Sequence, residues 1–299
     1  MRQIGIGNGF ACRNSIEVRS KYVDPGEVDM NKFQIIGSVQ VKNEDVFVAQ
    51  VVRNILDFCD KIIITDNLST DRTYEICEEL SHQYPTKIDL VSIEHPREAA
   101  LLLEPYYGTK SWVFGVDGDE IYDPVRLSVM RELLLRGEFS ENWCIFGNVL
   151  NVVSLDMRHK KAKGYLAPPS RSMTKLYNFS IIENWVNCPE RLLGDEVSFK
   201  KGFHIGLRKY LHEEISWESS DFRCLHMPFM KRSSKQRIRF FRTRLNPDEI
   251  SHVNAQPNWF LKRVRAAQLF MSQIVGRDWK SQKYRRGNLV GKDVTQFFS

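Results

Sequence analysis

Between residues 33 and 125 the sequence alternates short apolar runs with helix-forming stretches, and this alternation restricts the fold more than any other feature. Runs with the length and composition of buried strands cover Phe33–Val41, Lys61–Thr65, Lys87–Ile93 and Ser111–Val116. Strands that alternate with helices are typical of βαβ units and a parallel sheet. We therefore expect an α/β fold with a mixed, mostly parallel sheet flanked by helices.

Helix signals separate these runs. Asn43 is the predicted N-cap of the first helix, whose apolar face carries Phe47, Val51 and Ile55. Further helices are predicted over residues 71–82, 98–107, 124–136, 231–245 and 257–275. The pattern is less regular beyond residue 140, where strands are predicted over 143–153, 173–179 and 203–207.

The charge of the chain is unevenly distributed. The 299 residues contain 43 Lys or Arg and 37 Asp or Glu, a net charge of +6. Residues 228–299 hold sixteen of the basic residues and four of the acidic ones, a local +12, so the first 227 residues sum to −6. The basic region has three interpretations: helices that pack on the rest of the protein and meet an anionic ligand, a peripheral membrane surface, or a nucleic-acid surface. Because no nucleic-acid-binding module is recognisable, we expect no nucleic-acid partner.

The sequence also predicts a compartment. It shows no secretory signal and no run of 18 apolar residues, and its six cysteines form no CxxC pair. We expect free thiols and a cytoplasmic location, or one at the cytoplasmic membrane surface.

Acidic residues follow two of the predicted strands. Asp66 follows the second strand, and Asp117 and Asp119 flank Gly118 after the fourth. Ligands of open α/β sheets bind beyond the carboxyl ends of the strands, and carboxylates held this close favour a hard cation such as Mg²⁺ or Mn²⁺. A polar β-turn is the alternative interpretation of Asp-Gly-Asp.

Three segments in order, VKNE at 41–44, ITDNLSTD at 64–71 and WVFGVDGDE at 112–120, resemble GT-A glycosyltransferases, especially family-2-like members. The resemblance covers residues 33–125 and implies that Val41 and Glu44 line a nucleotide pocket and that Asp66 accepts a hydrogen bond from the base. It implies that Asp117 faces the ribose or the metal and that Asp119 binds the metal. The chain departs from the family pattern where Leu68 and Arg72 replace usual glycines.

The resemblance also implies roles for residues further along the chain. Asp195 is the preferred catalytic base, with Glu196, Glu213 and Glu214 as alternatives. His226 is a candidate ligand of the metal or contact of the diphosphate, and Lys231 a candidate contact of the nucleotide-sugar. In one interpretation of the basic region Lys231, Arg232 and Lys235 cover the diphosphate. His204 and Glu213 are candidate acceptor contacts.

We therefore expect a metal-dependent glycosyltransferase that uses Mn²⁺ or Mg²⁺. It would move a sugar from a nucleotide-diphospho-sugar to a glycan, lipid-linked or small-molecule acceptor, with inversion. The alternatives are a nucleotidyltransferase on a related fold and a non-catalytic glycan- or membrane-binding module.

The predicted domain division is an extension (1–32), a catalytic domain (33–229, with a donor half to 125 and an acceptor half from 126) and a basic helical region (230–299). The apolar face of 257–275 would also suit a homodimer.

Overall fold

The computed structural model describes residues 33–166, 175–189, 192, 196–236 and 252–299. The predicted N-terminal extension (1–32), Asp195 and most of the helix predicted over 231–245 lie outside these residues. The α/β prediction is confirmed for the described part of the chain.

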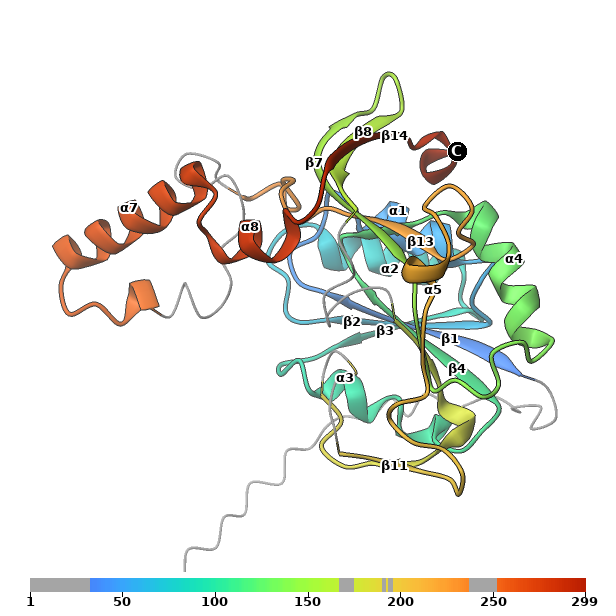
Figure 1. Cartoon of the computed structure of the whole chain (residues 1–299). Helices are drawn as coiled ribbons and strands as arrows, with labels where there is room; N and C mark the ends of the chain where they lie inside the picture. Colours follow the sequence, from blue (N-terminus) through green and yellow to red (C-terminus); the bar gives the residue numbers. More distant parts are fainter. Residues whose placement is uncertain (1–32, 167–174, 190–191, 193–195, 237–251) are drawn as a thin grey trace, which may run out of the picture.

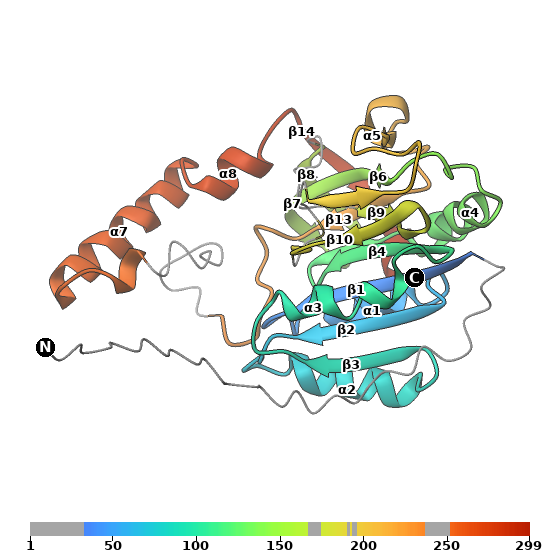
Figure 2. The same ribbon diagram turned by 90° about the horizontal axis from the view of Figure 1, so that it is seen from below.

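A seven-stranded sheet forms the centre of the molecule, in the order β12-β6-β9-β4-β1-β2-β3 (Figures 1 and 2). The four strands β3, β2, β1 and β4 run parallel to one another, and β9 runs antiparallel to β4 and β6. The strands span Gln34–Val41 (β1), Lys61–Asp66 (β2), Ile88–Ser92 (β3), Ser111–Asp117 (β4), Cys144–Phe146 (β6), Lys175–Asn178 (β9) and Arg208–Tyr210 (β12).

Both faces of this sheet are buried, because successive strand residues point to opposite sides. Ile35 and Phe114 belong to the core on one face, which contains α1 (Val48–Ile55), α2 (Thr73–Gln83) and α4 (Pro124–Leu135). Ile36 and Val113, their sequence neighbours, belong to the core on the other face. Figure 1 shows these helices on one side of the sheet and α3 (Glu98–Leu101) on the other. Continuous apolar runs such as QIIGSVQV therefore fit central parallel strands covered on both sides.

A second sheet of five strands, in the order β14-β8-β7-β13-β5, packs beside the first. The single strand predicted over 143–153 is divided between the two sheets, because β6 ends at Phe146 and β7 begins at Asn148. A Cβ on the intervening Gly147 would lie 2.1 Å from the carbonyl oxygen of Phe222. The strands span Glu120–Tyr122 (β5), Asn148–Asp156 (β7), Lys161–Tyr165 (β8), Arg223–His226 (β13) and Leu289–Asp293 (β14), and Ile182–Trp185 (β10) pairs separately with Val197–Phe199 (β11).

Some predicted elements differ from the observed ones. The first helix begins at Val48 and not after Asn43, because Asn43 adopts a left-handed φ of 55° that a helix start does not allow. Residues 203–207 form no strand, and residues 231–236 are not helical. The helix predicted over 98–107 is a single turn, α3, followed by the 3₁₀ turn Glu104–Tyr106 (η1).

The basic C-terminal region is only partly helical. It contains α7 (Trp259–Val275), which projects from the body, and α8 (Trp279–Tyr284). The chain then returns to the body, where β14 pairs with β8 and the 3₁₀ turn Thr295–Phe298 (η3) buries Phe297. Two shorter elements complete the fold, Phe179–Ile181 (η2) and Leu211–Glu214 (α5). None of the helices in the described residues has the length and apolarity needed to cross a bilayer, and none of the cysteines there forms a disulfide.

Candidate active site

The carboxyl ends of β1, β2 and β4 meet at one edge of the large sheet. In the register, Val41 lies beside Asp66 and Gln40 lies beside Asp117. The sequence-predicted acidic residues are therefore brought to the same edge, as parallel strands require.

The loops after β1 and β2 are joined by hydrogen bonds. The amide of Thr70 donates to Asn43 Oδ1 at 2.7 Å, and the amide of Asn43 donates to Ser69 Oγ at 2.9 Å. The amide of Glu44 donates to Thr73 Oγ1 at 2.7 Å. Because Asn tolerates the left-handed conformation, Asn43 can turn its side chain toward the second loop. The two sequence segments 41–44 and 64–71 thus build one polar wall.

Asp66 presents a buried oxygen at this wall. Its Oδ2 accepts a hydrogen bond of 2.9 Å from the amide of Ser69, whereas its buried Oδ1 has no hydrogen-bond partner within the described residues. A buried acceptor without a donor is costly unless a ligand supplies one. Asp66 Oδ1 is therefore suited to accept a hydrogen bond from a bound molecule.

Gly118 allows the third segment to approach the first. A Cβ at this position would lie 2.9 Å from Glu44 Cγ, closer than real Cβ contacts come, and 3.0 Å from Val41 Cγ1, which is tighter than most. The amide of Gly118 donates to the carbonyl of Gln40 at 3.2 Å. The glycine of Asp-Gly-Asp thus fixes the separation between the two predicted nucleotide-pocket residues and the acidic pair.

Asp119 lies buried in the centre of the site, with 1% of its surface exposed. Its Oδ2 accepts a hydrogen bond from Arg232 Nη1, which also lies 3.4 Å from Glu44 Oε1. Burial alone would raise the pKa of Asp119, but the charges of Arg232 and His226 outweigh it and hold this pKa at about 2. Asp119 is therefore ionised and paired with a guanidinium.

His226, at the end of β13, faces the same carboxylate. Its Nε2 lies 3.7 Å from Asp119 Oδ2, and its Nδ1 lies 2.9 Å from Asn151 Oδ1. Burial lowers the pKa of His226 to about 4, although the charge of Asp119 opposes this shift. A neutral imidazole whose Nδ1–H donates to Asn151 leaves the Nε2 lone pair directed into the site, as metal-binding histidines require.

Of the three basic residues expected to cover the diphosphate, Lys231, Arg232 and Lys235, it is Arg232 that reaches Asp119. Lys231 and Lys235 are exposed, whereas the side chain of Arg232 is only 16% exposed. The sequence interpretation missed Lys280, which is buried on α8, donates to the carbonyl of Pro228 at 3.3 Å and lowers the pKa of Asp119. Within a run such as Lys-Arg-Ser-Ser-Lys, no local pattern distinguishes the residue that turns inward.

Residues 232–236 cross the edge of the site and hold the two loops together. Ser233 Oγ donates to Asp71 Oδ2 at 2.5 Å, and the amide of Ser234 donates to Asp45 Oδ1 at 2.6 Å. The amide of Val46 donates to the carbonyl of Arg232 at 3.1 Å. We call residues 232–236 the strap, because they fasten the end of β13 to the loops after β1 and β2.

The predicted acceptor residues His204 and Glu213 have no hydrogen bond to the residues of this cluster among the contacts of the described residues. His204 is exposed, and its Nδ1 accepts a local hydrogen bond from the amide of Gly206. Glu213 is exposed on α5. Ile215, which follows α5, accepts a hydrogen bond through its carbonyl from the side chain of Asn148. Asn148 lies three residues before Asn151 along β7, about 10 Å from the His226 end. The predicted base, Asp195, lies outside the described residues.

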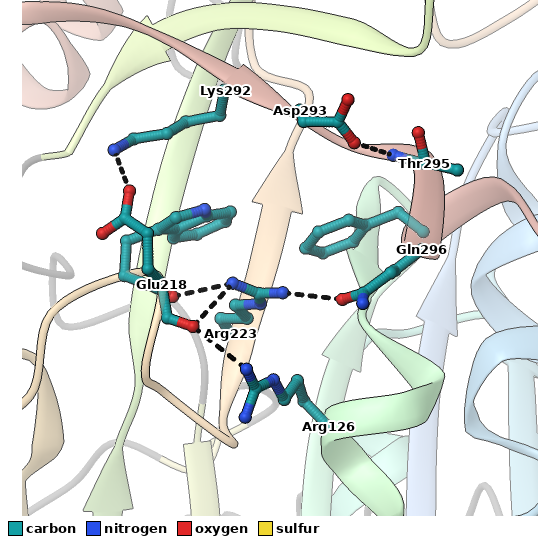
Figure 3. A pocket seen from close by; sticks show the side chains of 9 residues that line it. Arg126, Glu218, Arg223, Lys292, Asp293, Thr295 and Gln296 are labelled. Atoms are coloured by element: carbon teal, nitrogen blue, oxygen red, sulfur yellow. Dashed lines mark hydrogen bonds and ion pairs between the residues drawn. The ribbon is translucent and has the colours of Figure 1, made fainter.

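A separate hollow of about 450 Å³ lies at the opposite end of β13. Figure 3 shows that its cations have partners, because Arg223 donates to the backbone carbonyl of Glu218 and to Gln296 Oε1, and Lys292 forms an ion pair with the Glu218 carboxylate. Arg223 also forms a buried ion pair of 2.7 Å with Asp123. This hollow is where the returning C-terminal residues pack, and its lining includes none of the carboxylates of the cluster.

The sheet topology and the acidic edge, with Asp66 and Asp-Gly-Asp after two parallel strands, define the GT-A-like class of α/β proteins. Comparison with known proteins is consistent with this class. Residues 39–215, more than half of the chain, match the family described as Glycosyl transferase family 2, and the chain belongs to that family.

Two curated relatives are uncharacterized glycosyltransferases of Rickettsia. The protein of Rickettsia conorii is 25% identical and that of Rickettsia felis 24% identical, each over 189 residues. Each alignment covers 62% of this chain and 62% of the relative, so the chain spans less than two thirds of the length of these relatives.

Solved structures show weaker likeness. The crystal structure of S. aureus TarS covers 82% of this chain and 43% of that chain, with 14% identity and a TM-score of 0.42. The glucosyl-3-phosphoglycerate synthase of Mycobacterium tuberculosis, in complex with Mn²⁺, UDP-glucose and phosphoglyceric acid, covers 40% of this chain and 44% of that chain. Its identity is 20% and its TM-score 0.29.

Proposed function

We propose that this protein transfers a sugar from a nucleotide-diphospho-sugar donor to an acceptor hydroxyl on a glycan, a lipid-linked molecule or a small molecule. The observation that carries the proposal is the convergence of Asp66, Asp117 and Asp119 at one sheet edge, with Arg232 and His226 beside them. Membership of glycosyl transferase family 2 supports it.

Each part of the edge suits one part of such a donor. The free acceptor atom of Asp66 suits an N–H of the base, in a pocket beside Val41 and Glu44. Asp117, at the end of β4, suits the ribose. Arg232 carries the positive charge that a diphosphate needs, and planar guanidinium groups bind phosphate oxygens well.

In the proposed reaction the acceptor oxygen attacks the anomeric carbon of the donor. A new carbon–oxygen bond forms as the bond to the diphosphate breaks, and its electron pair leaves with the nucleoside diphosphate. The acceptor proton passes to a carboxylate base, for which Asp195 remains our proposal. The cation of Arg232 stabilises the charge that develops on the leaving group.

A divalent ion fits this site with two protein ligands. Asp119 Oδ2 and the neutral Nε2 of His226 lie 3.7 Å apart, a separation that two ligands of one ion can have. No group of three His, Cys, Asp or Glu side chains in the described residues could hold an ion alone, so oxygen atoms of the donor would complete the coordination. Bound Mn²⁺ or Mg²⁺ would act as a Lewis acid on the diphosphate. Arg232 contacts the same Asp119 oxygen and would have to release it.

We also propose that residues 33–125 form the donor half and residues 126–229 the acceptor half of the catalytic domain. The contacts of the strap with Asp45 and Asp71 indicate that residues 232–236 act with the donor half.

Thermal unfolding of the protein with a panel of nucleoside diphosphates, with and without Mn²⁺, tests the proposal. A ligand that binds only the folded state raises the unfolding temperature by mass action. We expect one diphosphate to raise it in the wild type, and Asp119→Ala to abolish this rise. The matched control is Asp57→Ala, which removes an exposed carboxylate from the end of α1.

A second measurement separates transfer from binding alone. A nucleotide-sugar built on the diphosphate that stabilises the protein should be hydrolysed slowly to that diphosphate by the wild type and by Asp57→Ala. The proposal fails if no diphosphate stabilises the protein, or if Asp119→Ala responds as the wild type does. Binding with no turnover of any nucleotide-sugar would instead indicate a non-catalytic module.

A further inference from the structure

Helix α7 exposes apolar side chains that the rest of the described structure does not cover. Phe260 is 61% exposed, Met271 54% and Val275 59%, and Val264 and Ile274 are also exposed. Gln273 is the only buried residue of the helix. Figures 1 and 2 show α7 extending away from both sheets.

These side chains form one stripe along the helix. At 100° per residue Phe260, Val264, Met271, Ile274 and Val275 fall within an arc of about 100°. The helix is well delimited, because Asn258 caps its first turn by accepting from the amide of Leu261 at 2.9 Å. Gly276 ends it in the left-handed conformation, with φ of 71°. The stripe is thus a continuous face on a defined helix.

Positive charge surrounds this face. The helix contains Lys262, Arg263 and Arg265 and no acidic residue. Arg263 and Arg265 fall on either side of the stripe at helical spacing, and Arg263 also lies over the ring of Trp259, 5.2 Å from its centroid. Residues 252–286 together carry eight Lys or Arg and one Asp.

We propose that α7 binds in the plane of an anionic membrane surface, with its apolar stripe in the boundary between headgroups and acyl chains. An interfacial helix needs a large apolar face, cations beside it and aromatic residues near the headgroups, and α7 has all three. A second copy of this chain is a poorer occupant, because two basic helices would repel each other in contact.

The position of α7 relates this surface to the candidate active site. Helix α8 follows α7 after three residues, and its Tyr284 ring packs at 4.9 Å against the ring of His226. Lys280 of α8 donates to Pro228, beside the strap. If the proposed function holds, membrane binding would bring the candidate active site near lipid-linked molecules; the binding itself does not depend on catalysis.

Co-sedimentation of the full chain with phosphatidylcholine vesicles, with and without phosphatidylglycerol, tests the proposal. Each cation near an anionic surface contributes about 1 kcal/mol, so we expect binding at least about tenfold tighter to the vesicles that contain phosphatidylglycerol. Raising the salt concentration should weaken it.

Variants distinguish binding through the apolar stripe from non-specific adsorption to vesicles. Phe260→Glu/Met271→Glu/Ile274→Glu should lose vesicle binding at least about tenfold, and Arg263→Gln/Arg265→Gln should lose most of the preference for phosphatidylglycerol. Met157→Glu, which changes an exposed side chain after β7, is the matched control and should bind as the wild type does. Circular dichroism and the unfolding temperature establish that each variant is folded.

The proposal is overturned if the wild type does not bind anionic vesicles, or if the triple variant binds them equally well. It is also overturned if the wild type forms a dimer that the triple variant does not form, while neither binds vesicles. That result would assign the stripe to a second copy of the chain.

Discussion

The carboxylate cluster and helix α7 depart from the usual distribution of side chains in opposite ways. In the cluster, Asp119 and Glu44 are buried beside Arg232, whose side chain is 16% exposed, whereas charged residues usually lie in water. In α7, apolar side chains such as Phe260 and Met271 lie in water, whereas such residues usually lie in the core. Each departure costs free energy in the isolated protein, and under the two proposals above a ligand of matching chemistry would offset that cost.

The two regions also differ in how tightly they are held. Every segment of the cluster is fixed by others, through the hydrogen bonds between the loops and the strap. Helix α7 has few contacts with the body. Substitutions at the cluster should therefore affect both stability and ligand binding, and substitutions on α7 should affect only what α7 binds.

The largest contrast is expected from removing one arginine in each region. Arg232→Met should lower the free energy of unfolding by about 3 kcal/mol or more, because it leaves buried carboxylates without their cation. Arg265→Met on α7 should change it by less than about 0.5 kcal/mol. Urea unfolding of both variants measures the difference. Equal changes in the free energy of unfolding would mean that water, and not Arg232, stabilises the charge of Asp119.

Glycine substitutions give the next contrast. Gly118→Ala should cost about 1 to 3 kcal/mol and weaken nucleoside diphosphate binding, because its Cβ would overlap Glu44 and Val41. Gly291→Ala in β14 is the control, since nothing lies within 4 Å of its Cβ. Retention of full nucleotide affinity by Gly118→Ala would show that the two segments can separate without harm.

Asp71 tests whether the strap fastens the cluster. Burial alone would raise the pKa of Asp71, but the hydrogen bonds from Ser233 and Thr73 outweigh it and lower this pKa below the ordinary value of 3.8. The folded state therefore gains stability from ionised Asp71 above that pH and loses it as the pH falls through the lowered pKa.

We accordingly expect Asp71→Asn to cost about 1 to 2 kcal/mol near neutral pH. The difference from the wild type should shrink as the pH falls below 3.8. Urea unfolding of both proteins across this range is the measurement, and a difference that does not depend on pH would contradict the hydrogen-bonded carboxylate.

The smallest effect is expected at Leu68, which has φ of 49° and is 55% exposed. Leu68→Gly should raise the free energy of unfolding by up to about 1 kcal/mol, because it removes the left-handed strain of a branched side chain. Leu289→Gly, at an equally exposed position in β14, should lower it by about 0.5 to 1 kcal/mol. Thermal unfolding compares the two variants. A change in the free energy of unfolding of the same sign in both would contradict the assignment of strain to Leu68.

The sequence predicts those features that depend on local pattern. Buried parallel strands are continuous apolar runs, so the ends of β2 and β4, and with them Asp66 and Asp119, can be located from the sequence. The inward turn of Arg232 in place of Lys231 depends on contacts with segments more than a hundred residues away. The same holds for β14, whose five residues acquire strand structure by pairing with β8. The predicted cap at Asn43 was wrong because its side chain bonds to the next loop instead of to its own helix.

Helix α7 lies between two segments that are fixed to the body, the strap and α8. Ser233 of the strap donates to Asp71, and on α8 Lys280 donates to the carbonyl of Pro228 and Tyr284 packs against His226. Doubling the length of a connection between two fixed points costs only about 0.6 kcal/mol in closure entropy. The stretch that carries α7 could therefore be lengthened, shortened or exchanged for a different surface while the sheet and the carboxylate edge stay intact. The surface through which the protein attaches and the site at which it binds its substrate can therefore change independently of each other.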